Sequence, residues 1–562
     1  MQTASTFSGE GRLQTVDEGV AVTLSPGWLA SDWNLVDGSY PTITSSASNW
    51  SYSWVSSDGI TLSNANIAYP TFTAPDVSVG VPVDYTFTVT IDDGAGNTQN
   101  ITSIITVNHV NSAPTFTSTA ITSAEIGETY TLSITTSDAD NDIPTFSGTT
   151  LPSWLALTDN GNGTATLSGL SLDSNMGIHN VVITANDGTS NSSNNSVQVS
   201  FSIMVSSEPA GTGSQSDPYL VAKLGTLYWM TQNSGEWASG KYYKQTADID
   251  ASSTSSWDGN QGFTPLGNDN TNFRANYDGD GFVISNVFIN RTTNKVGFFG
   301  IVSTSTISNL GMTNLDITTT GVYVGGLVGL LKANSTVTNC YTTGDVTGGG
   351  SAVGGLVGNN DGGTVSNSYS TASVTGSGSY VGGLVGYQNN SPIINSYSTG
   401  NVSGSSHVGG LVGSTIRTVT ITNSYSTGDV TGGGQYVGGF VGRNETAEIS
   451  NSYSTGNVTR SSGGSTNYGG FVGYNAATIS YSYSTGSVSY TGATSPTDKG
   501  FVGEDVSGTY TNNLWDTETS SQSTSSGATG KTTAEMQTQS TFTGVSWSFT
   551  DPGDGASFWK IF

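Results

Sequence analysis

The stretch Val381–Gly404 reads "VGGLVGYQNNSPIINSYSTGNVSG" and decides how the rest of the chain is read. It combines a glycine-rich "VGGLVG" with "NSYSTG" a short distance downstream. Taken alone, this could be a catalytic loop, a ligand site or scaffolding. The same arrangement recurs on both sides of this stretch, so its meaning depends on how regularly it repeats.

The recurrence has a period of 27 to 31 residues. Aligned on the second glycine of "GGLVG" or its variants, eight units begin at Gly297, Gly326, Gly355, Gly383, Gly410, Gly439, Gly470 and Gly500. Each unit holds three short strand-like pieces separated by turns, too little to bury a core alone. Units of this kind become stable by stacking on their neighbours, which predicts a solenoid.

Three columns of residues repeat from unit to unit. An apolar column contains Val337, Val365, Ile393, Ile421, Ile449 and Ile479. A second column contains Asn339, Asn367, Asn395, Asn423, Asn451 and then Tyr481. A third contains Tyr341, Tyr369, Tyr397, Tyr425, Tyr453 and Tyr483. In a stacked solenoid the apolar column forms the core, while the Asn and Tyr columns predict amide and aromatic ladders along the rod.

The repeats resemble the GLUG motif family. The resemblance covers roughly residues 213 to 550, including "FRANYDGDGFVISNVFI" before the repeats and "NNLWDTETSSQST" after them. It implies a right-handed parallel β-helix in secreted, adhesin-like bacterial surface proteins. The period and the columns favour the same fold.

Two modules precede the repeats. Residues 1–111 alternate with period two in "YTFTVTID" and "ITSIITVNHV", which predicts a β-sandwich. "WSYSWVSSDGITLSNANIAYPTFTAPDV" resembles the PKD and related immunoglobulin-like modules of bacterial surface proteins. Residues 112–206, with "LPSWLALTDNGNGTATLSG" and "VVITANDG", resemble the dystroglycan-type cadherin-like or "putative Ig" domain.

The predicted fold class is therefore all-β: two immunoglobulin-like β-sandwiches, then a right-handed parallel β-helix of about eight coils with short capping helices. Residues 207–212 are predicted as a linker, 213–294 as the first turns and cap of the helix, 295–516 as the GLUG repeats, and 517–562 as a C-terminal cap or extension. A short helix is expected over residues 219–228. Another is expected where Thr532 and Glu535 have the spacing of a capping box.

Composition limits the partners and the compartment. Asp and Glu number 41 against 14 Lys and Arg, a formal net charge of −27, so nucleic acid is excluded as a partner. The single cysteine, Cys340, excludes an intramolecular disulfide and any site with several thiolates. No apolar run is long enough to span a membrane, and "MQTASTFSGEGRLQ" is not a signal peptide. We expect an extracellular or bacterial cell-surface protein whose secretion signal and anchor are not in this chain.

Catalytic groups do not converge in the repeats. A β-helical polysaccharide lyase or glycoside hydrolase needs an acid and a base at one glycosidic bond, roughly 5 to 9.5 Å apart in glycosidases. In the position after "NSYSTG", Asp345 and Asp429 lie three coils apart, about 14 Å. The histidines His109, His179 and His407 share no motif, and Cys340 takes the place of a packed serine. No catalytic residue and no organic cofactor is predicted, and an enzyme remains the alternative.

Two other ligand hypotheses concern the ladders. The Tyr column could offer a face for stacking sugars. The neighbouring column Thr343, Thr371, Thr399, Thr427, Thr455 and Thr485 could order water, which would make the chain an ice-binding adhesin. Regular spacing favours a structural role for both columns. Sequence variation, and hence specificity, lies instead in loops such as "YQNNSP", residues 387–392.

One acidic cluster predicts a metal. "SDADNDIP" places Asp138, Asp140, Asn141 and Asp142 within five residues, and "ANDG" adds Asp187 near the end of the same module. Ca²⁺ takes six to eight oxygen ligands, which such residues supply. Cadherin-like domains bind calcium through Asp clusters at module junctions, so the resemblance implies the same role for these five residues. The alternative is an ordinary acidic turn.

The function expected from the sequence is that of an extracellular modular adhesin or surface-display protein. The sandwiches would act as spacers, stiffened by Ca²⁺. The β-helix would bind a glycan, a cell-surface ligand or further copies of the chain.

Overall fold

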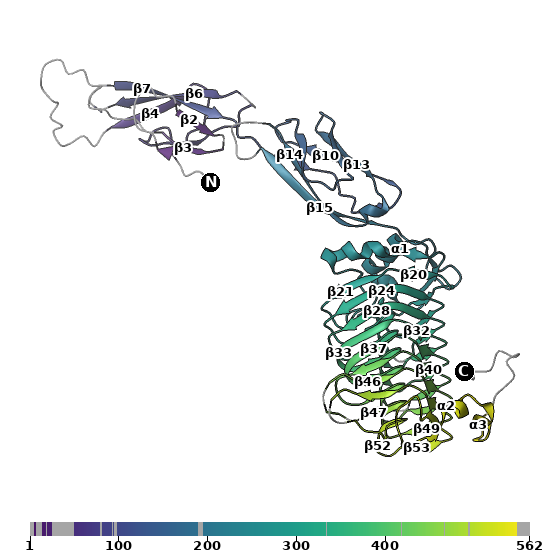
Figure 1. Ribbon diagram of the computed structural model, residues 1–562. Coiled ribbons are helices and arrows are strands. Elements are labelled where there is room, and N and C mark those ends of the chain that lie inside the picture. The colour runs from purple at the N-terminus through teal and green to yellow at the C-terminus, as the bar shows by residue number, and fades with distance from the viewer. Residues whose placement is uncertain are drawn as a thin grey trace, which may run out of the picture. The chain divides into compact units, whose positions relative to one another are not determined.

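The chain is described from a computed structural model (Figure 1). It describes residues 5–6, 14–17, 19–24, 50–78, 81–92, 94, 98–188, 195–332, 334–417, 419–462, 464–465, 467–492 and 495–547. Much of the predicted first sandwich and the last 15 residues of the predicted C-terminal extension lie outside these ranges. The chain divides into two compact units, Met1–Thr122 with Thr129–Leu170 and Ile178–Ile203, and Ser123–Glu128 with Ser171–Gly177 and Met204–Phe562.

The described strands of residues 1–111 form two sheets, of order β1-β3-β5 and β2-β7-β6-β4. The strands are β1 (Ser5–Thr6), β2 (Gln14–Asp17), β3 (Ala21–Thr23), β4 (Ser51–Ser56), β5 (Thr71–Thr73), β6 (Val83–Asp92) and β7 (Thr98–Asn108). Alternate residues of β6 point inward, so that Phe87, Val89 and Ile91 are buried. They pack with Trp54 and Phe72 in one apolar cluster, as expected for an immunoglobulin-like module.

The next module has two four-stranded sheets, of order β12-β13-β10-β8 and β11-β14-β15-β9. The elements are β8 (Thr115–Phe116), β9 (Ser123–Glu125), β10 (Thr129–Ser137), β11 (Thr145–Thr150), β12 (Ala156–Asp159), β13 (Thr164–Leu170), the 3-10 helix η1 (Asp173–Asn175), β14 (Gly177–Asn186) and β15 (Ser196–Ser206). Leu132, Ile134, Leu167 and Ile183 fill its interior. The predicted all-β class is confirmed for this module.

The second unit is a parallel β-solenoid whose coils contribute strands to three long sheets (Figure 1). One sheet contains β16 (Tyr219–Val221), β17 (Tyr242–Gln245), β19 (Asn276–Asp278), β23 (Thr306–Ser308), β27 (Thr336–Thr338), β31 (Thr364–Ser366), β35 (Ile393–Ile394), β39 (Thr420–Thr422), β44 (Glu448–Ser450), β49 (Thr478–Ser480) and β53 (Thr509–Thr511). Another, of eight strands, contains β22 (Phe299–Val302), β26 (Val328–Lys332), β30 (Val357–Asp361), β34 (Val385–Asn389), β38 (Val412–Ile416), β43 (Val441–Asn444), β48 (Val472–Asn475) and β52 (Val502–Asp505). These eight strands follow the eight glycine units that the sequence predicts.

The third sheet has 21 strands because several coils contribute more than one segment to it. They are β18 (Ile249–Asp250), β20 (Val283–Ser285), β21 (Phe288–Arg291), β24 (Gly311–Thr319), β25 (Val324–Gly325), β28 (Tyr341–Gly348), β29 (Val353–Gly354), β32 (Tyr369–Ser370), β33 (Ser373–Gly382), β36 (Tyr397–Ser398), β37 (Val402–Gly409), β40 (Tyr425–Ser426), β41 (Val430–Gly432), β42 (Val437–Gly438), β45 (Tyr453–Ser454), β46 (Val458–Arg460), β47 (Tyr468–Gly469), β50 (Tyr483–Ser484), β51 (Val488–Tyr490), β54 (Leu514–Asp516) and β55 (Thr529–Lys531).

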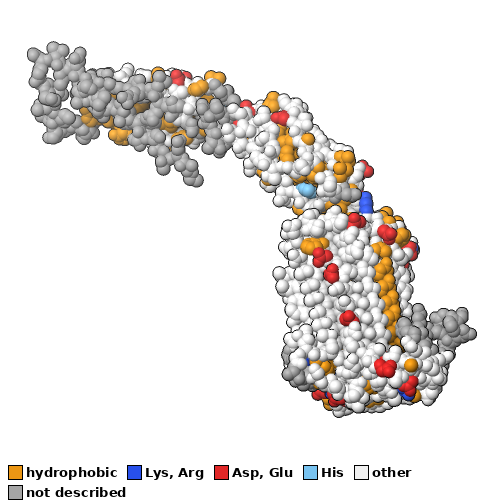
Figure 2. All heavy atoms as spheres, in the orientation of Figure 1, with side chains coloured by type: hydrophobic (Ala, Val, Ile, Leu, Met, Phe, Trp, Pro, Cys, Tyr) orange, Lys and Arg blue, Asp and Glu red, His pale blue; other side chains and the backbone are white. Residues whose placement is uncertain are grey.

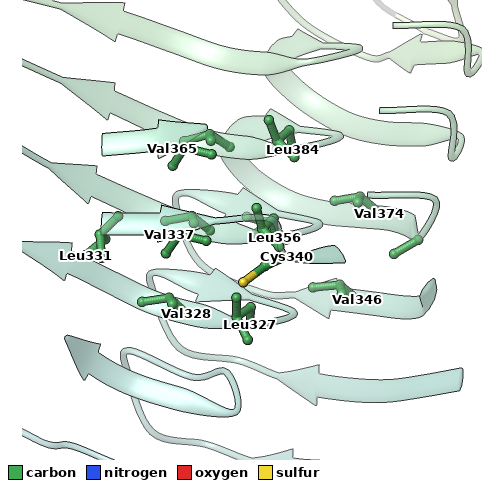
Figure 3. Packing of buried hydrophobic residues seen from close by; sticks show 14 of the residues in the cluster. Leu327, Val328, Leu331, Val337, Cys340, Val346, Leu356, Val365, Val374 and Leu384 are labelled. Atoms are coloured by element: carbon green, nitrogen blue, oxygen red, sulfur yellow. The ribbon is translucent and has the colours of Figure 1, made fainter. Parts of the chain in front are cut away.

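The solenoid core is built from columns of equivalent residues. Val337 pairs in register with Val365, which pairs with Ile393, and the column continues to Ile479 with every member fully buried. Figure 3 shows Leu327, Leu356 and Leu384 from successive glycine units pointing into the same interior. The predicted apolar column is therefore confirmed as core.

The predicted asparagine column is also confirmed, and its backbone explains the choice of residue. Asn339, Asn367, Asn395, Asn423 and Asn451 have φ between 48° and 54°, in the left-handed region that Asn tolerates better than most residues. The side-chain amide of Asn395 donates to Asn367 at 3.1 Å, and that of Asn423 donates to Asn395 at 3.1 Å. Each Asn therefore serves both as a turn residue and as one rung of a ladder.

This double role predicts a graded response to substitution. Asn395→Gly keeps the left-handed turn and loses only the amide contacts, so we expect a loss of about 1 kcal/mol in unfolding free energy. Asn395→Ala loses the contacts and also strains the backbone, so the loss should be about 2 kcal/mol or more. Urea unfolding of the full chain measures both. Equal losses for the two variants would show that the backbone conformation contributes nothing.

Helices lie near both ends of the solenoid, and the predicted N-terminal helix is present but begins later than expected. Tyr219–Val221 forms strand β16, which pairs with β17, and helix α1 begins only at Leu224 (Leu224–Gln232). Strand pairing overrides the helical spacing because Tyr219 and Val221 are buried in the first coil. The 3-10 helices η2 (Ser234–Trp237) and η3 (Ser252–Asn260) follow.

The C-terminal helices α2 (Thr533–Met536) and α3 (Gln539–Thr543) end the described chain. The predicted capping box is confirmed, because the Thr532 hydroxyl accepts from the Glu535 backbone N–H while the Glu535 carboxylate accepts from the Thr532 N–H. Phe542 and Trp547 pack against Tyr483, the last ring of the tyrosine column.

Candidate functional site

The acidic residues predicted to bind metal gather at one end of the second module. Asp138, Asp140 and Asp142 lie in the loop between β10 and β11, and Asp187 follows β14 directly. Asp138 Oδ1 accepts the backbone N–H groups of Asp140, at 2.8 Å, and Asp142, at 3.4 Å. Asn141 has a φ of 63° and an exposed side chain, so it forms the tip of this turn.

The segment that follows β7 is held by two of these acids. Asp140 Oδ2 accepts the backbone N–H of Ser112 at 2.7 Å, and its Oδ1 lies 3.2 Å from His109 Nε2. Asn111 Nδ2 donates to Asp187 Oδ2 at 2.7 Å. His109, which shares no sequence motif with the other histidines, therefore contacts the acidic cluster.

Two carboxylate oxygens of the cluster are buried without a hydrogen bond, from any residue that the structure describes, to offset the loss of solvent. Asp138 Oδ2 and Asp142 Oδ2 are buried, and neither accepts a hydrogen bond from a described residue. Burial raises the pKa of the Asp142 carboxyl, and the charges of Asp138, Asp187 and Asp140 raise it further. Even so, no group of three or more His, Cys, Asp or Glu side chains among the described residues is arranged to hold a metal ion.

The tyrosine column forms the aromatic ladder that the sequence predicts. Rings from Tyr341 to Tyr483 stack one per coil with centroids 4.6 to 5.0 Å apart and planes within 5° of parallel. The surface of the solenoid shows a continuous hydrophobic stripe along its length (Figure 2). Because neighbouring rings stack face to face in register, the column buries ring faces against each other and serves the scaffold.

A second aromatic column, on the other side of the glycine turn, was missed. The residue before each "VGG" has a left-handed backbone, with φ of 62° at Tyr323, 67° at Tyr380, 52° at His407 and 60° at Tyr436. For bulky residues this conformation costs on the order of 1–3 kcal/mol each, and it tends to occur at functional sites. The sequence does carry a signal for this column, because an aromatic residue stands directly before "VGG" at Tyr380, His407 and Tyr436.

A neighbouring column on the eight-stranded sheet adds more rings and charge. Its in-register positions include Tyr387 in β34, Ser414 in β38, Arg443 in β43 and Tyr474 in β48. The sequence predicted "YQNNSP" (387–392) as a variable loop, but its first three residues, from Tyr387 to Asn389, belong to strand β34. We call the two columns together the aromatic face, defined as Tyr380, Tyr387, His407, Ser414, Tyr436, Arg443 and Tyr474.

The rings of the aromatic face are tilted, unlike those of the ladder. Tyr380 lies 5.0 Å from both Tyr387 and His407, at interplanar angles of 48° and 51°. His407 meets Tyr436 at 65°, and Tyr436 meets Tyr474 at 58°. All five rings are half-buried. At such angles neighbouring rings do not cover each other's faces, so aromatic surface remains available.

Polar groups are set among these rings. The Arg443 guanidinium lies 5.3 Å from the centroid of Tyr474 and 6.0 Å from that of Tyr436, and it forms an ion pair with Glu445. Burial and, to a smaller extent, the charge of Arg443 lower the pKa of His407 to about 4, so the imidazole is neutral at physiological pH. His407 Nδ1, Ser414 Oγ and Arg443 Nε are buried and have no hydrogen-bond partner among the described residues.

The structure adds a neighbour to one candidate catalytic group, because Asp345 pairs in register with Asp316, an aspartate outside the column compared in the sequence. Asp345 is exposed, and its in-register neighbours are the exposed Asp316 on one coil and Ser373 on the other. An exposed carboxylate pair on a sheet face lacks the burial that tunes a general acid. Cys340 is buried among Leu327, Leu356 and Val337 (Figure 3), and burial raises the pKa of its thiol to about 12. A thiol in this state is a packing residue.

Two protein families match parts of the chain. The GLUG motif matches residues 320–347, 349–375, 377–403, 433–459 and 464–489, all within the solenoid. The family described as "Putative Ig domain" matches residues 113–206, the second sandwich. The chain thus contains GLUG repeats that form a β-solenoid, preceded by an Ig-type domain, as the sequence predicted. None of the described helices is long and apolar enough to cross a membrane.

Among curated relatives, "Halomucin" of Haloquadratum walsbyi is 38% identical over 146 residues, which are 25% of this chain and 2% of that protein. A "Putative Gly-rich membrane protein" of Evansella cellulosilytica is 33% identical over 128 residues, 22% of this chain and 14% of that protein. The chain therefore spans only a small part of either relative.

Solved structures with some likeness include extracellular cadherin domains 3–6 of protocadherin gamma B2, at 16% identity over 31% of this chain and 44% of that chain, with a TM-score of 0.20. An endo-fucoidan hydrolase, MfFcnA4 from glycoside hydrolase family 107, is 18% identical over 35% of this chain and 28% of that chain, with a TM-score of 0.15. TM-scores this low support no conclusion about fold or activity.

Proposed function

We propose that the chain is an extracellular adhesin or surface-display protein that binds glycans, cells or further copies of itself through the solenoid. The observation that carries the proposal is the aromatic face, where half-buried rings and unsatisfied polar atoms stand on an otherwise repetitive scaffold. The families that match are repeat and Ig-type modules, and one relative is named as a membrane protein. The two sandwiches act as spacers.

A binding screen tests this function. The full chain is coupled to fluorescent beads and presented to bacterial and eukaryotic cells, to immobilised polysaccharides and to beads that carry the same chain. We expect retention on at least one of these surfaces. Beads coated with an unrelated acidic protein control for non-specific charge effects. If the beads bind nothing while the free protein releases reducing or unsaturated ends from polysaccharides, the chain is an enzyme instead.

We further propose that Asp138, Asp140, Asn141, Asp142 and Asp187 bind Ca²⁺. The donor set is all oxygen, which suits this cation. Two buried carboxylate oxygens accept no hydrogen bond from a described residue, and burial together with like charges raises the pKa of Asp142, so a cation would relieve a cost that the folded module bears. Because no three acids among the described residues are already arranged for a metal, binding requires these side chains to rearrange.

Calcium should therefore stabilise the sandwich of residues 112–206. In calorimetry of the full chain, excess Ca²⁺ is expected to raise the melting temperature of one transition by about 5 °C or more over the value in chelator. Asp138→Ala combined with Asp140→Ala should abolish the rise. Asp345→Ala combined with Asp429→Ala, which removes two exposed acids of the solenoid, should leave it intact. Identical curves with calcium and with chelator would contradict calcium binding.

A further inference from the structure

The aromatic face places rings at left-handed backbone positions that the solenoid can also fill with smaller residues. The fold needs a left-handed residue before each "VGG", and elsewhere in the same coil it fills such a position with Asn. Ala352 fills one of the positions before "VGG", so a ring is not required there. Tyr380, His407 and Tyr436 therefore place aromatic side chains at strained positions where the scaffold does not call for them.

Unused hydrogen-bonding capacity coincides with these rings. His407 Nδ1 and Ser414 Oγ come from one coil and Arg443 Nε from the next, and all three lack partners among the described residues. Native proteins pair the great majority of buried polar atoms, so several unpaired atoms in one patch indicate a ligand or ordered water. The patch thus combines tilted aromatic rings with a small number of polar groups, as ligand-binding surfaces do.

Charge narrows the ligand class. Arg443 is neutralised by its ion pair with Glu445, and His407 is neutral, so the face offers no net positive charge. The chain as a whole carries a formal net charge of −27, which repels polyanions. An uncharged ligand with apolar faces and many hydroxyl groups satisfies both the rings and the unpaired polar atoms. Linear carbohydrates have this chemistry.

The spacing narrows the shape of the ligand. Rings of the column before "VGG" recur once per coil, at about 4.8 Å along the rod. The observed centroid separations of 5.0 Å between Tyr380 and His407 and 5.2 Å between His407 and Tyr436 follow this rise. An extended chain lying parallel to the solenoid axis meets one ring per coil, whereas a compact ligand meets only one or two.

We propose that the aromatic face binds an uncharged linear polysaccharide, with sugar rings stacked on Tyr380, His407 and Tyr436 and hydroxyl groups bonded to the partly exposed Arg443 guanidinium. This inference rests on the proposed adhesin function and names the ligand class and the surface. The stacked tyrosine ladder takes no part, because its rings already cover one another.

The test uses Asn, which the left-handed backbone tolerates. Tyr380→Asn combined with Tyr436→Asn removes two rings without straining the turn, so the melting temperature should not fall. In affinity electrophoresis, the unaltered full chain is run through gels containing cellulose derivatives, β-1,3-glucan, xylan, galactomannan or alginate. We expect retardation by at least one uncharged polymer, unchanged at high salt. The double variant should bind that polymer at least tenfold more weakly.

Tyr341→Ser in the tyrosine ladder is the matched control and should leave retardation unchanged. Equal retardation of the double variant and the unaltered chain would overturn the inference, as would retardation by alginate alone or by none of the polymers. Bead adhesion separates this failure from that of the adhesin function. If the double variant adheres to cells as well as the unaltered chain does, the chain is still an adhesin but the aromatic face is not its binding site.

Discussion

Replacing Gly383 with alanine is expected to lower the unfolding free energy of the solenoid by at least about 3 kcal/mol. A Cβ at this position would lie 2.2 Å from the carbonyl oxygen of Gly410 on the next coil and within 3.0 Å of two atoms of Ser398. The Gly410 carbonyl oxygen is a backbone atom, so it cannot avoid the added Cβ by a change of side-chain rotamer. Coils could separate only by stretching the ladder of hydrogen bonds between them.

Gly464→Ala is the matched control. Gly464 is exposed, lies in the same solenoid, and a Cβ there would meet nothing within 4 Å. Urea unfolding followed by circular dichroism should give a much lower midpoint for Gly383→Ala and an unchanged or slightly higher one for Gly464→Ala. Similar midpoints for the two variants would show that close backbone approach between coils does not limit this position.

Trp515→Ala is expected to cost about 3–5 kcal/mol by leaving a large cavity at the end of the rod. The position belongs to the column of Ser370, Ser398, Ser426, Ser454 and Ser484. In earlier coils this serine donates to a glycine carbonyl, as Ser426 does to Gly439 at 2.6 Å. In the last coil the buried indole of Trp515 packs against Gly500 instead and closes the core.

Denaturant unfolding and size-exclusion chromatography measure the effect of Trp515→Ala. Besides the loss of stability, we expect concentration-dependent association, because an uncapped solenoid exposes apolar surface and strand edges at its end. Val506→Ala, in the same coil but with a side chain 57% exposed, should change neither readout. A Trp515→Ala chain that unfolds at the original midpoint would show that Trp515 does not close the core.

Some features of the molecule could be predicted without a structure because they repeat. One coil lies on the next in register, so residues one period apart in the sequence become neighbours in space. From the spacing alone it was therefore possible to predict the core column that ends at Ile479. The amide ladder through Asn395 and the stacked rings of Tyr397 and Tyr425 follow in the same way. It also explained why Cys340, standing in a serine column, is buried.

Local signals were dependable only where the contacts are local. The capping box at Thr532 and Glu535 joins residues three apart and was predicted correctly. The start of helix α1 was predicted wrongly, because Tyr219 forms a strand that pairs with Tyr243, a residue 24 positions away in the sequence. Likewise, no sequence motif predicts the contacts of His109 with Asp140 and of Asn111 with Asp187, because they join residues that belong to different predicted modules.

The sequence by itself determined the repeat, the core and the ladders of this protein, because residues one period apart in the sequence become neighbours when the coils stack. Only the tertiary structure revealed the aromatic face. That surface depends on a left-handed backbone at Tyr380, His407 and Tyr436, and on contacts between two different columns, such as Tyr380 with Tyr387. Contacts within a column follow from the period, whereas contacts between columns follow from how each coil bends, and that bend is set by packing and turn geometry in three dimensions.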